Sequence, residues 1–157
     1  YQVDLTRFTG LPIIYLTTES AIISKEDYVD GTFRLEGGRD YNSVDEMTME
    51  IRGRGNSTWF VHPKKPYQMK LESKRDLFGM LADKKWLFLA EYSDKTLLRN
   101  HLAFALGHLT TLRWTPSGHF AEVFVNGEHD GVYLVSDSSG QDGVTFDTGY
   151  RRFVEVD

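Results

Sequence analysis

The feature that most constrains this chain is a charged, glycine-containing turn between two segments of alternating polarity. Residues 47–51 (MTMEI) alternate apolar and polar side chains, and residues 67–72 (YQMKLE) do the same. A two-residue apolar period is typical of strands with one buried face. Between the two segments the chain reads RGRGNSTW over residues 52–59. The sequence therefore predicts two strands joined by a loop whose glycines lie at a strand end.

Two interpretations of this arginine–glycine loop (residues 52–59) follow from its residues. Gly53 and Gly55 let backbone N–H groups approach a ligand without a Cβ clash, while Arg52 and Arg54 carry planar charged forks that suit phosphate or carboxylate. Glycine, asparagine and serine are also ordinary turn formers, and arginines at strand ends are commonly solvated or paired with acids. The loop alone leaves both a ligand site and a structural turn open.

Further strands are predicted by short β-rich runs along the chain. The best hairpin signal is Asn126-Gly127, which lies between two apolar runs, and an Asn-Gly step favours a tight turn. A glycine-rich loop is expected at residues 37–43. The other predicted strands occupy residues 12–17, 32–35, 86–89, 120–125, 131–135 and 152–156.

One helix is predicted, beginning at Ser93 or Asp94 and ending near Leu109. Either first residue can cap exposed N–H groups with a side-chain oxygen. Leucine and alanine recur at helical spacing and are expected to pack on the sheet, at Leu98, Leu102, Ala105, Leu106 and Leu109. Arg99 and Asn100 are expected to tie the helix to a neighbouring carbonyl or acid. The predicted fold class is α+β, a mainly antiparallel sheet with one principal helix packed on it.

Composition narrows the function classes. The chain has 157 residues, 40% of them hydrophobic, which is enough for one domain with a real core. A net charge of −5 argues against a general nucleic-acid binder, since binding to the phosphate backbone needs a basic surface. There are no cysteines, so disulfides and zinc–thiolate sites are excluded, and the five histidines are too scattered to predict a metal site. No apolar run is long enough to span a membrane.

Four further motifs follow the arginine–glycine loop. They are LFGMLADKKWLFLA at residues 77–90, YSDKTLLRN at 92–100, FVNGE at 124–128 and GVYLV at 131–135. In this order they resemble the CotH family, the spore-coat-protein-H-like atypical kinases. The resemblance implies the N-terminal, nucleotide-lobe part of a divergent protein-kinase-like fold. It also implies transfer of phosphate from ATP to protein Ser/Thr with Mg or Mn as cofactor, and an extracellular, cell-envelope or spore-surface location.

The chain also departs from the family pattern. Where members usually carry a Glu-Gln-Ile-Lys-like segment, residues 136–143 read SDSSGQDG and contain no lysine. The Asn-x-Asp-like and Trp-Asp-x-Asp-like elements that hold the family's catalytic and metal-binding aspartates do not occur. The catalytic residues therefore stay unidentified. We expect residues 1–157 to form a single, truncated CotH-like domain that is inactive by itself, with any kinase chemistry dependent on sequence beyond Asp157.

Two functions remain as hypotheses. In the first, the chain is the nucleotide-binding part of a CotH-like protein kinase with a protein substrate. Its phosphate-side candidates would be Arg52, Arg54, Asn56, Ser57, Lys64 and Lys65, and Trp59 or Tyr67 would either flank a base or pack. In the second, the chain is a non-catalytic extracellular binding or structural module on the same scaffold, which contacts protein or glycan through exposed aromatic side chains. Its contact candidates would be Trp59, Phe60, Trp114 and Tyr150.

Overall fold

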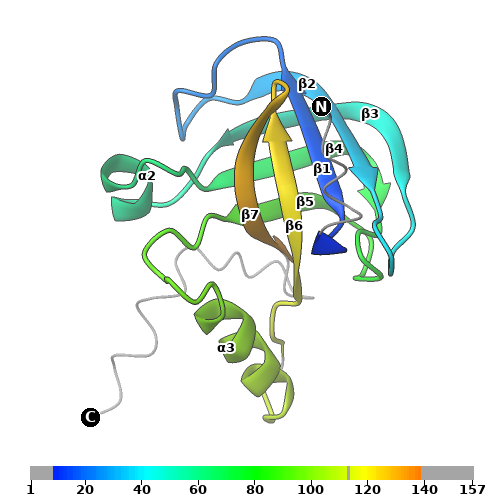
Figure 1. Cartoon of the computed structure of the whole chain (residues 1–157), viewed down its shortest axis with the longest axis vertical. Coiled ribbons are helices and arrows are strands. Elements are labelled where there is room, and N and C mark those ends of the chain that lie inside the picture. The colour runs from blue at the N-terminus through cyan, green and yellow to red at the C-terminus, as the bar shows by residue number, and fades with distance from the viewer. Residues whose placement is uncertain (1–8, 113, 139–157) are drawn as a thin grey trace.

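The described part of the chain folds as a closed barrel of seven strands, with the helices α2 and α3 outside the strand order (Figure 1). The structure is a computed structural model, and it describes residues 9–112 and 114–138. The strand order around the barrel is β1-β2-β3-β4-β5-β7-β6. The elements are β1 (Ile13–Thr18), β2 (Val29–Glu36), β3 (Val44–Gly53), α2 (Ser57–Val61), β4 (Tyr67–Arg75), β5 (Asp83–Leu89), α3 (Arg99–His108), β6 (Gly118–Val125) and β7 (Glu128–Asp137).

A parallel pairing between the first and sixth strands closes the barrel. β1 lies beside β6 with Ile13 opposite Glu122 and Leu16 opposite Val125, whereas every other neighbouring pair is antiparallel. The predicted α+β class, a mainly antiparallel sheet with one principal helix packed on it, was therefore wrong. The prediction failed because polarity patterns locate strands but do not show which distant strands pair. The predicted Asn-Gly hairpin is confirmed: Asn126 and Gly127 both have positive φ, at 52° and 84°, between β6 and β7.

The core fills the barrel with alternate residues of its strands. Trp86 and Phe88 of β5 are fully buried, as are Tyr133 and Val135 of β7. The alternation in β5 is what a strand with one inward face requires, whereas β7 also buries Leu134, between Tyr133 and Val135. The remaining fully or nearly fully buried interior residues are Ile14, Leu16, Phe33, Leu35, Met49, Ile51, Met69, Leu71, Ala121 and Val123.

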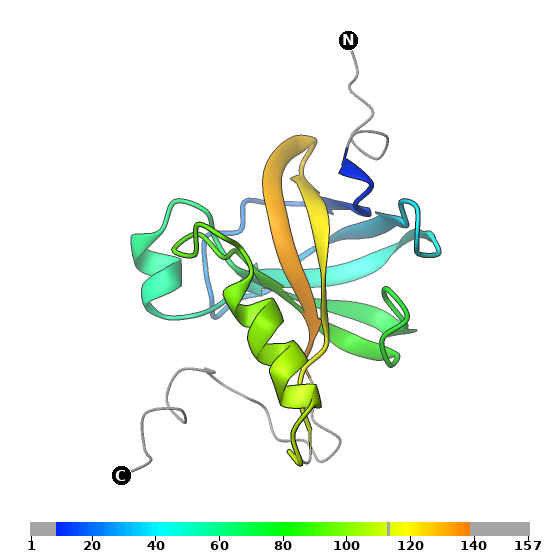
Figure 2. The same ribbon diagram turned by 60° about the horizontal axis from the view of Figure 1, so that its bottom comes forward.

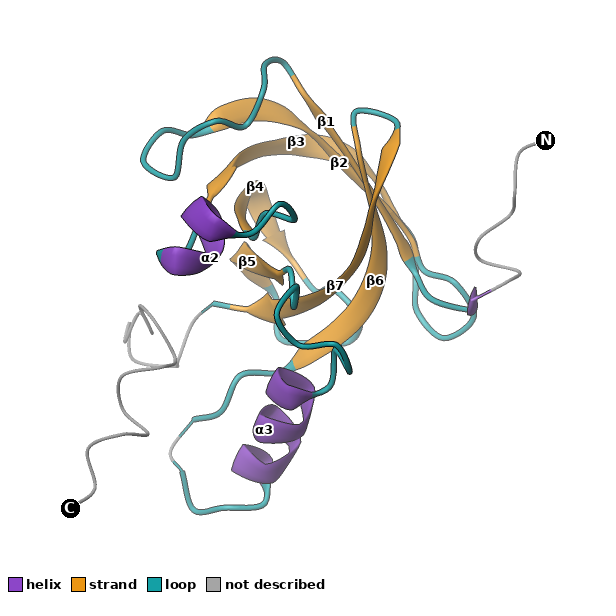
Figure 3. Cartoon of the chain, turned by 60° about the vertical axis from the view of Figure 1, so that its left-hand side comes forward, coloured by secondary structure: helices purple, strands orange, loops and turns teal. Residues whose placement is uncertain are grey.

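Strand direction brings four connections to one end of the barrel. Because β1 and β6 run parallel and the other neighbours antiparallel, β1, β3, β5 and β6 all end on the same side. We call this the loop end, and it carries the connections at residues 19–28, 54–66, 90–98 and 126–127. Figure 3 looks toward the opening, with α2 at its rim and α3 outside the ring of strands. The arginine–glycine loop therefore meets segments far from it in sequence.

α3, which runs beside the barrel in Figure 2, is shorter than predicted. The residues that it buries also differ from those predicted. It begins at Arg99, because residues 94–98 form a turn in which Leu97 has φ of 60°. The N-cap is Leu98 and not Ser93 or Asp94, although the first helical N–H, that of Arg99, donates to Asp94 Oδ2 at 2.8 Å. The prediction that the leucines pack on the sheet was wrong: Leu102 and Leu106 are 58% and 55% exposed.

The barrel-facing side of α3 is instead formed by a small set of other residues. Gly107 is buried, and a Cβ added there would lie 2.5 Å from Thr115 Cγ2. Asn100 Nδ2 donates to Glu91 Oε1 at 2.7 Å, which confirms the predicted tie to an acid. Close approach and one polar anchor thus position the helix, rather than its leucines. The predicted strand at residues 152–156 and the contact candidate Tyr150 lie outside the described residues.

Candidate functional site at the loop end of the barrel

The arginine–glycine loop is anchored to the barrel by its own tryptophan. Trp59 in α2 is 8% exposed, and its ring lies so close to Gly53 that an added Cβ would be 2.4 Å from it. Gly55 has φ of 85°, a conformation that favours glycine. One glycine therefore accommodates a ring and the other makes the turn. Trp59 packs in the core and is neither an exposed contact residue nor free to flank a base.

The two arginines of the loop differ in their surroundings. Arg52 extends from β3 on the outer face, where its guanidinium lies 4.7 Å from the ring of Tyr28 and Nη2 is 3.4 Å from Gln68 Oε1. Its Nε is buried and has no hydrogen-bond partner among the described residues. Arg54 begins the connection to β4, and its N–H donates to the carbonyl of Pro66 at 3.1 Å. Arg52 is thus held against the barrel surface, whereas Arg54 belongs to the rim.

Two ammonium groups bracket the turn at Gly55. Lys25, from the connection between β1 and β2, donates to Asn56 Oδ1 at 3.2 Å. Lys65 donates to the carbonyl of Trp59 at 2.7 Å. Asn56 and Ser57 between them are exposed, with Asn56 just before α2 and Ser57 its first residue. Four of the predicted residues (Arg54, Asn56, Ser57 and Lys65) therefore share one cation-rich rim. Lys25 joins them from a segment about thirty positions away, which no local pattern predicted.

Lys64 has a different environment from Lys65. Its ammonium donates to the carbonyl of Ala90 at 2.9 Å and to that of Val132, and it lies 4.1 Å from the ring centre of Tyr133. These carbonyls belong to chain segments that diverge just beyond the last β5–β7 pair, Leu89 and Leu134. Burial lowers the pKa of Lys64, and nearby carboxylates partly offset that effect. Lys64 therefore bridges two segments at the loop end.

A buried tyrosine pair lies beside Lys64. Tyr67 Oη donates to Asp130 Oδ2 at 3.2 Å, and Tyr133 Oη lies 2.6 Å from the same oxygen. Burial raises the pKa of both phenols, so both stay protonated and act as donors. Tyr67 is 8% exposed, which makes it a core residue rather than a platform for a base.

Two further acids, Glu91 and Glu122, lie near enough to Lys64 to affect its pKa. Glu91 accepts the hydrogen bond from Asn100, and burial raises its pKa. Glu122 is 3% exposed and lies 2.6 Å from His129 Nε2 on the neighbouring strand. Sequence analysis did not select these residues. They meet through strand pairing and loop contacts, and each is an unremarkable strand or turn residue in its own segment.

The described residues do not offer a ready metal centre. Among them, no group of three or more histidine, aspartate or glutamate side chains is placed to hold a metal ion. The Mg or Mn expected from the resemblance stays an expectation, because magnesium at phosphate sites is usually held by one or two carboxylates together with the phosphates themselves. Within the same part of the chain, neither length nor hydropathy makes any helix a candidate to cross a bilayer.

The fold and the rim together define a barrel domain with a cation-rich, glycine-containing loop at one opening. A family model described as CotH kinase protein matches residues 51–145, which is more than half of the chain and starts at the arginine–glycine loop. The chain therefore belongs to the CotH family, as its motifs predicted. No curated protein matches it.

Proposed function

We propose that this chain is the nucleotide-binding part of a CotH-like protein kinase that transfers phosphate from ATP to protein Ser/Thr, at the cell envelope or spore surface. One observation carries the proposal: ammonium groups from two elements bracket the exposed turn at Asn56 and Ser57. Phosphoryl transfer depends mainly on positioning and on neutralising phosphate charge, so a rim of cations and polar groups suits the nucleotide's phosphates.

Within this proposal the six candidate residues have two roles. Arg54, Asn56, Ser57 and Lys65 lie on the rim and would contact phosphate, with Lys25 as an added cation. Arg52 and Lys64 would position the loop, since Arg52 stacks on Tyr28 and Lys64 bridges two carbonyls. Both would hold the rim in shape without touching the ligand.

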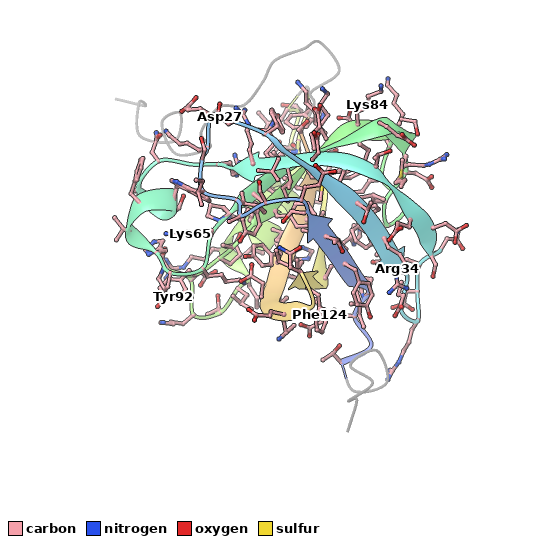
Figure 4. All side chains as sticks on the ribbon, turned by 90° about the horizontal axis from the view of Figure 1, so that it is seen from above. Asp27, Arg34, Lys65, Lys84, Tyr92 and Phe124 are labelled. Carbon is pink, nitrogen blue, oxygen red and sulfur yellow. The ribbon has the colours of Figure 1, made fainter. Side chains whose placement is uncertain are left out.

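Calorimetric titration of the whole chain with ATP, with and without Mg or Mn, tests this proposal. Saturable binding is expected, weakened about tenfold by Arg54→Ala or Lys25→Ala, because a charge-assisted hydrogen bond contributes roughly 1.5 kcal/mol. Lys84→Ala is the matched control, since it removes the same charge from the first part of β5, well away from Lys65 (Figure 4). A folded chain that does not bind ATP would overturn the proposal.

The second candidate function, a non-catalytic module for protein or glycan contacts, is favoured by the apolar side chains that α2 exposes. Phe60 and Val61 are 70% and 71% exposed, and the Lys25 ammonium lies 5.5 Å from the Phe60 ring. Val61→Ser separates the two functions, because Val61 is exposed on α2 and Phe60, which lies against Lys25, is kept. It would leave ATP affinity unchanged if the rim cations bind phosphate, and it would impair partner binding if α2 is a contact surface.

A further inference from the structure

The outward side of α3 is a row of leucines that the rest of the described chain leaves largely exposed. Leu98, Leu102 and Leu106 follow one another at four-residue spacing and are 54%, 58% and 55% exposed. Leu109 and Leu112 continue the row past the end of the helix, at 83% and 61% exposed. We call these five residues the leucine face. Contiguous apolar exposure of this kind marks interaction surfaces in folded proteins, whereas single exposed leucines do not.

The helix does not need these leucines to hold its position. Its barrel side is defined by Asn100, which bonds Glu91, and by Gly107, which packs against Thr115. His101 adds a ring contact with Phe120 on β6 at 5.3 Å. Figure 2 shows α3 running alongside the barrel, outside the strands. The leucine face therefore lies opposite a side that is already packed.

Charge around the leucine face identifies the kind of partner that fits it. No aspartate or glutamate occurs between Asp94 and Glu122, although the whole chain carries a net charge of −5. Within this stretch Lys95 and Arg99 lie near the start of α3, and His101 and His108 lie along it. The Arg99 side chain is 77% exposed, and its Nε lies 3.5 Å from Asp94 Oδ1. The leucines are thus set beside two cationic side chains, one of them paired with Asp94, and two histidines. Such a surface favours apolar residues accompanied by carboxylates.

We propose that the leucine face docks an amphipathic helix of another polypeptide, with apolar residues at i, i+4 and i+7 and with aspartate or glutamate beside them. Helix-on-helix recognition of this type uses residues at that spacing as anchors. A second copy of this chain fits less well, because it would bring one acid-free basic segment against another. This docking surface is independent of ATP binding at the loop end.

Fluorescence anisotropy with a synthetic peptide tests the proposal. The probe is a labelled helical peptide of about 18 residues with leucine at i, i+4 and i+7 spacing and glutamate beside the leucines. A matched peptide carries lysine in place of glutamate. Saturable binding of the acidic peptide is expected, with weaker binding of the basic one and a loss of affinity as salt concentration rises.

Variants locate the binding. Leu102→Glu and Leu106→Glu should each weaken the acidic peptide at least about tenfold, since a charge would enter an apolar contact. Leu81→Glu is the matched control, because Leu81 is 76% exposed but lies in the β4–β5 turn. Arg99→Glu should weaken the acidic peptide and strengthen the basic one. Circular dichroism of every variant confirms that it is folded.

Several results would overturn the proposal. Equal binding of the acidic and basic peptides would remove the charge argument, and unchanged binding by Leu102→Glu would remove the leucine face from the contact. If the folded chain does not bind the acidic peptide saturably, the proposed docking surface is wrong. A dimer in size-exclusion chromatography that Leu102→Glu dissociates would assign the face to a second copy instead.

Discussion

Replacing Lys64 with methionine tests whether this lysine holds the loop end together. Methionine keeps much of the side chain's length but removes the donor that serves the carbonyls of Ala90 and Val132. Each lost hydrogen bond from a charged donor costs about 1.5 kcal/mol. Burial of the charged ammonium, which lowers the pKa of Lys64, is itself unfavourable. Removing that charge therefore offsets part of the lost hydrogen-bond energy. A net decrease of roughly 2 kcal/mol in the free energy of unfolding is expected.

Urea unfolding followed by tryptophan fluorescence measures this decrease, because Trp86 is fully buried and reports on the barrel interior. Lys84→Met is the control: Lys84 donates one exposed hydrogen bond, to the carbonyl of Glu72 at 2.8 Å, and its loss should cost less than about 0.5 kcal/mol. If Lys64→Met and Lys84→Met have the same stability, the bridge at the loop end does not stabilise the fold, and the reasoning is refuted.

Three other perturbations probe the core and the edge of the barrel. Gly53→Ala should lower stability by about 2 kcal/mol, measured by urea unfolding, because the new Cβ would lie 2.4 Å from the Trp59 ring; wild-type stability would contradict this. Tyr133→Phe should lower the free energy of unfolding by about 1 kcal/mol, because the hydroxyl contact with Asp130 is lost. Tyr15→Phe should lower it by less, because the part-buried Tyr15 hydroxyl lies 3.4 Å from Glu36. Burial raises the pKa of Asp137 to about 6, above the ordinary 3.8, so the folded state binds this proton more tightly than the unfolded state. The contribution of Asp137 to stability is therefore complete below pH 4 and is lost as pH rises through 6. Asp137→Asn should stabilise the chain at pH 7 by about 1 kcal/mol after solvent screening, and should have little effect at pH 4. Equal effects of Asp137→Asn on stability at the two pH values would argue against a raised pKa of Asp137.

Local pattern predicted much of the strand content. The alternation of residues 47–51 and 67–72 corresponds to β3 and β4, and Asn126-Gly127 gave the β6–β7 turn. Closure could not be predicted in this way. It depends on the pairing of Ile13 with Glu122, more than a hundred positions apart, and side-chain alternation contains no information about such a pairing.

The buried face of α3 could not be predicted from the spacing of its apolar residues. α3 has apolar residues on more than one side, so a leucine stripe at the correct spacing did not identify its buried face. The face was decided by the smallest residue, Gly107, and by the bond from Asn100 to Glu91. Both are tertiary contacts that require knowledge of what lies opposite.

Only the part of the candidate site that lies within one segment of sequence could be predicted. The arginine–glycine loop and its polar residues were visible as a motif, and they lie together at the rim except for Arg52 and Lys64. Lys25 comes from the β1–β2 connection and Asp130 from the start of β7, and both reach the site because those segments lie at the same end of the barrel. No spacing rule relates them to the loop.

The measurement that tests the central claim most directly is a map of backbone amide chemical shifts in the isotope-labelled chain during titration with ATP and Mg. We predict saturable shifts in the amides of residues 54–58 and of Lys25 and Lys65, with residues 83–86 at the start of β5 unchanged. A folded chain whose amides in the arginine–glycine loop do not move at saturating ATP would contradict a nucleotide site at the loop end.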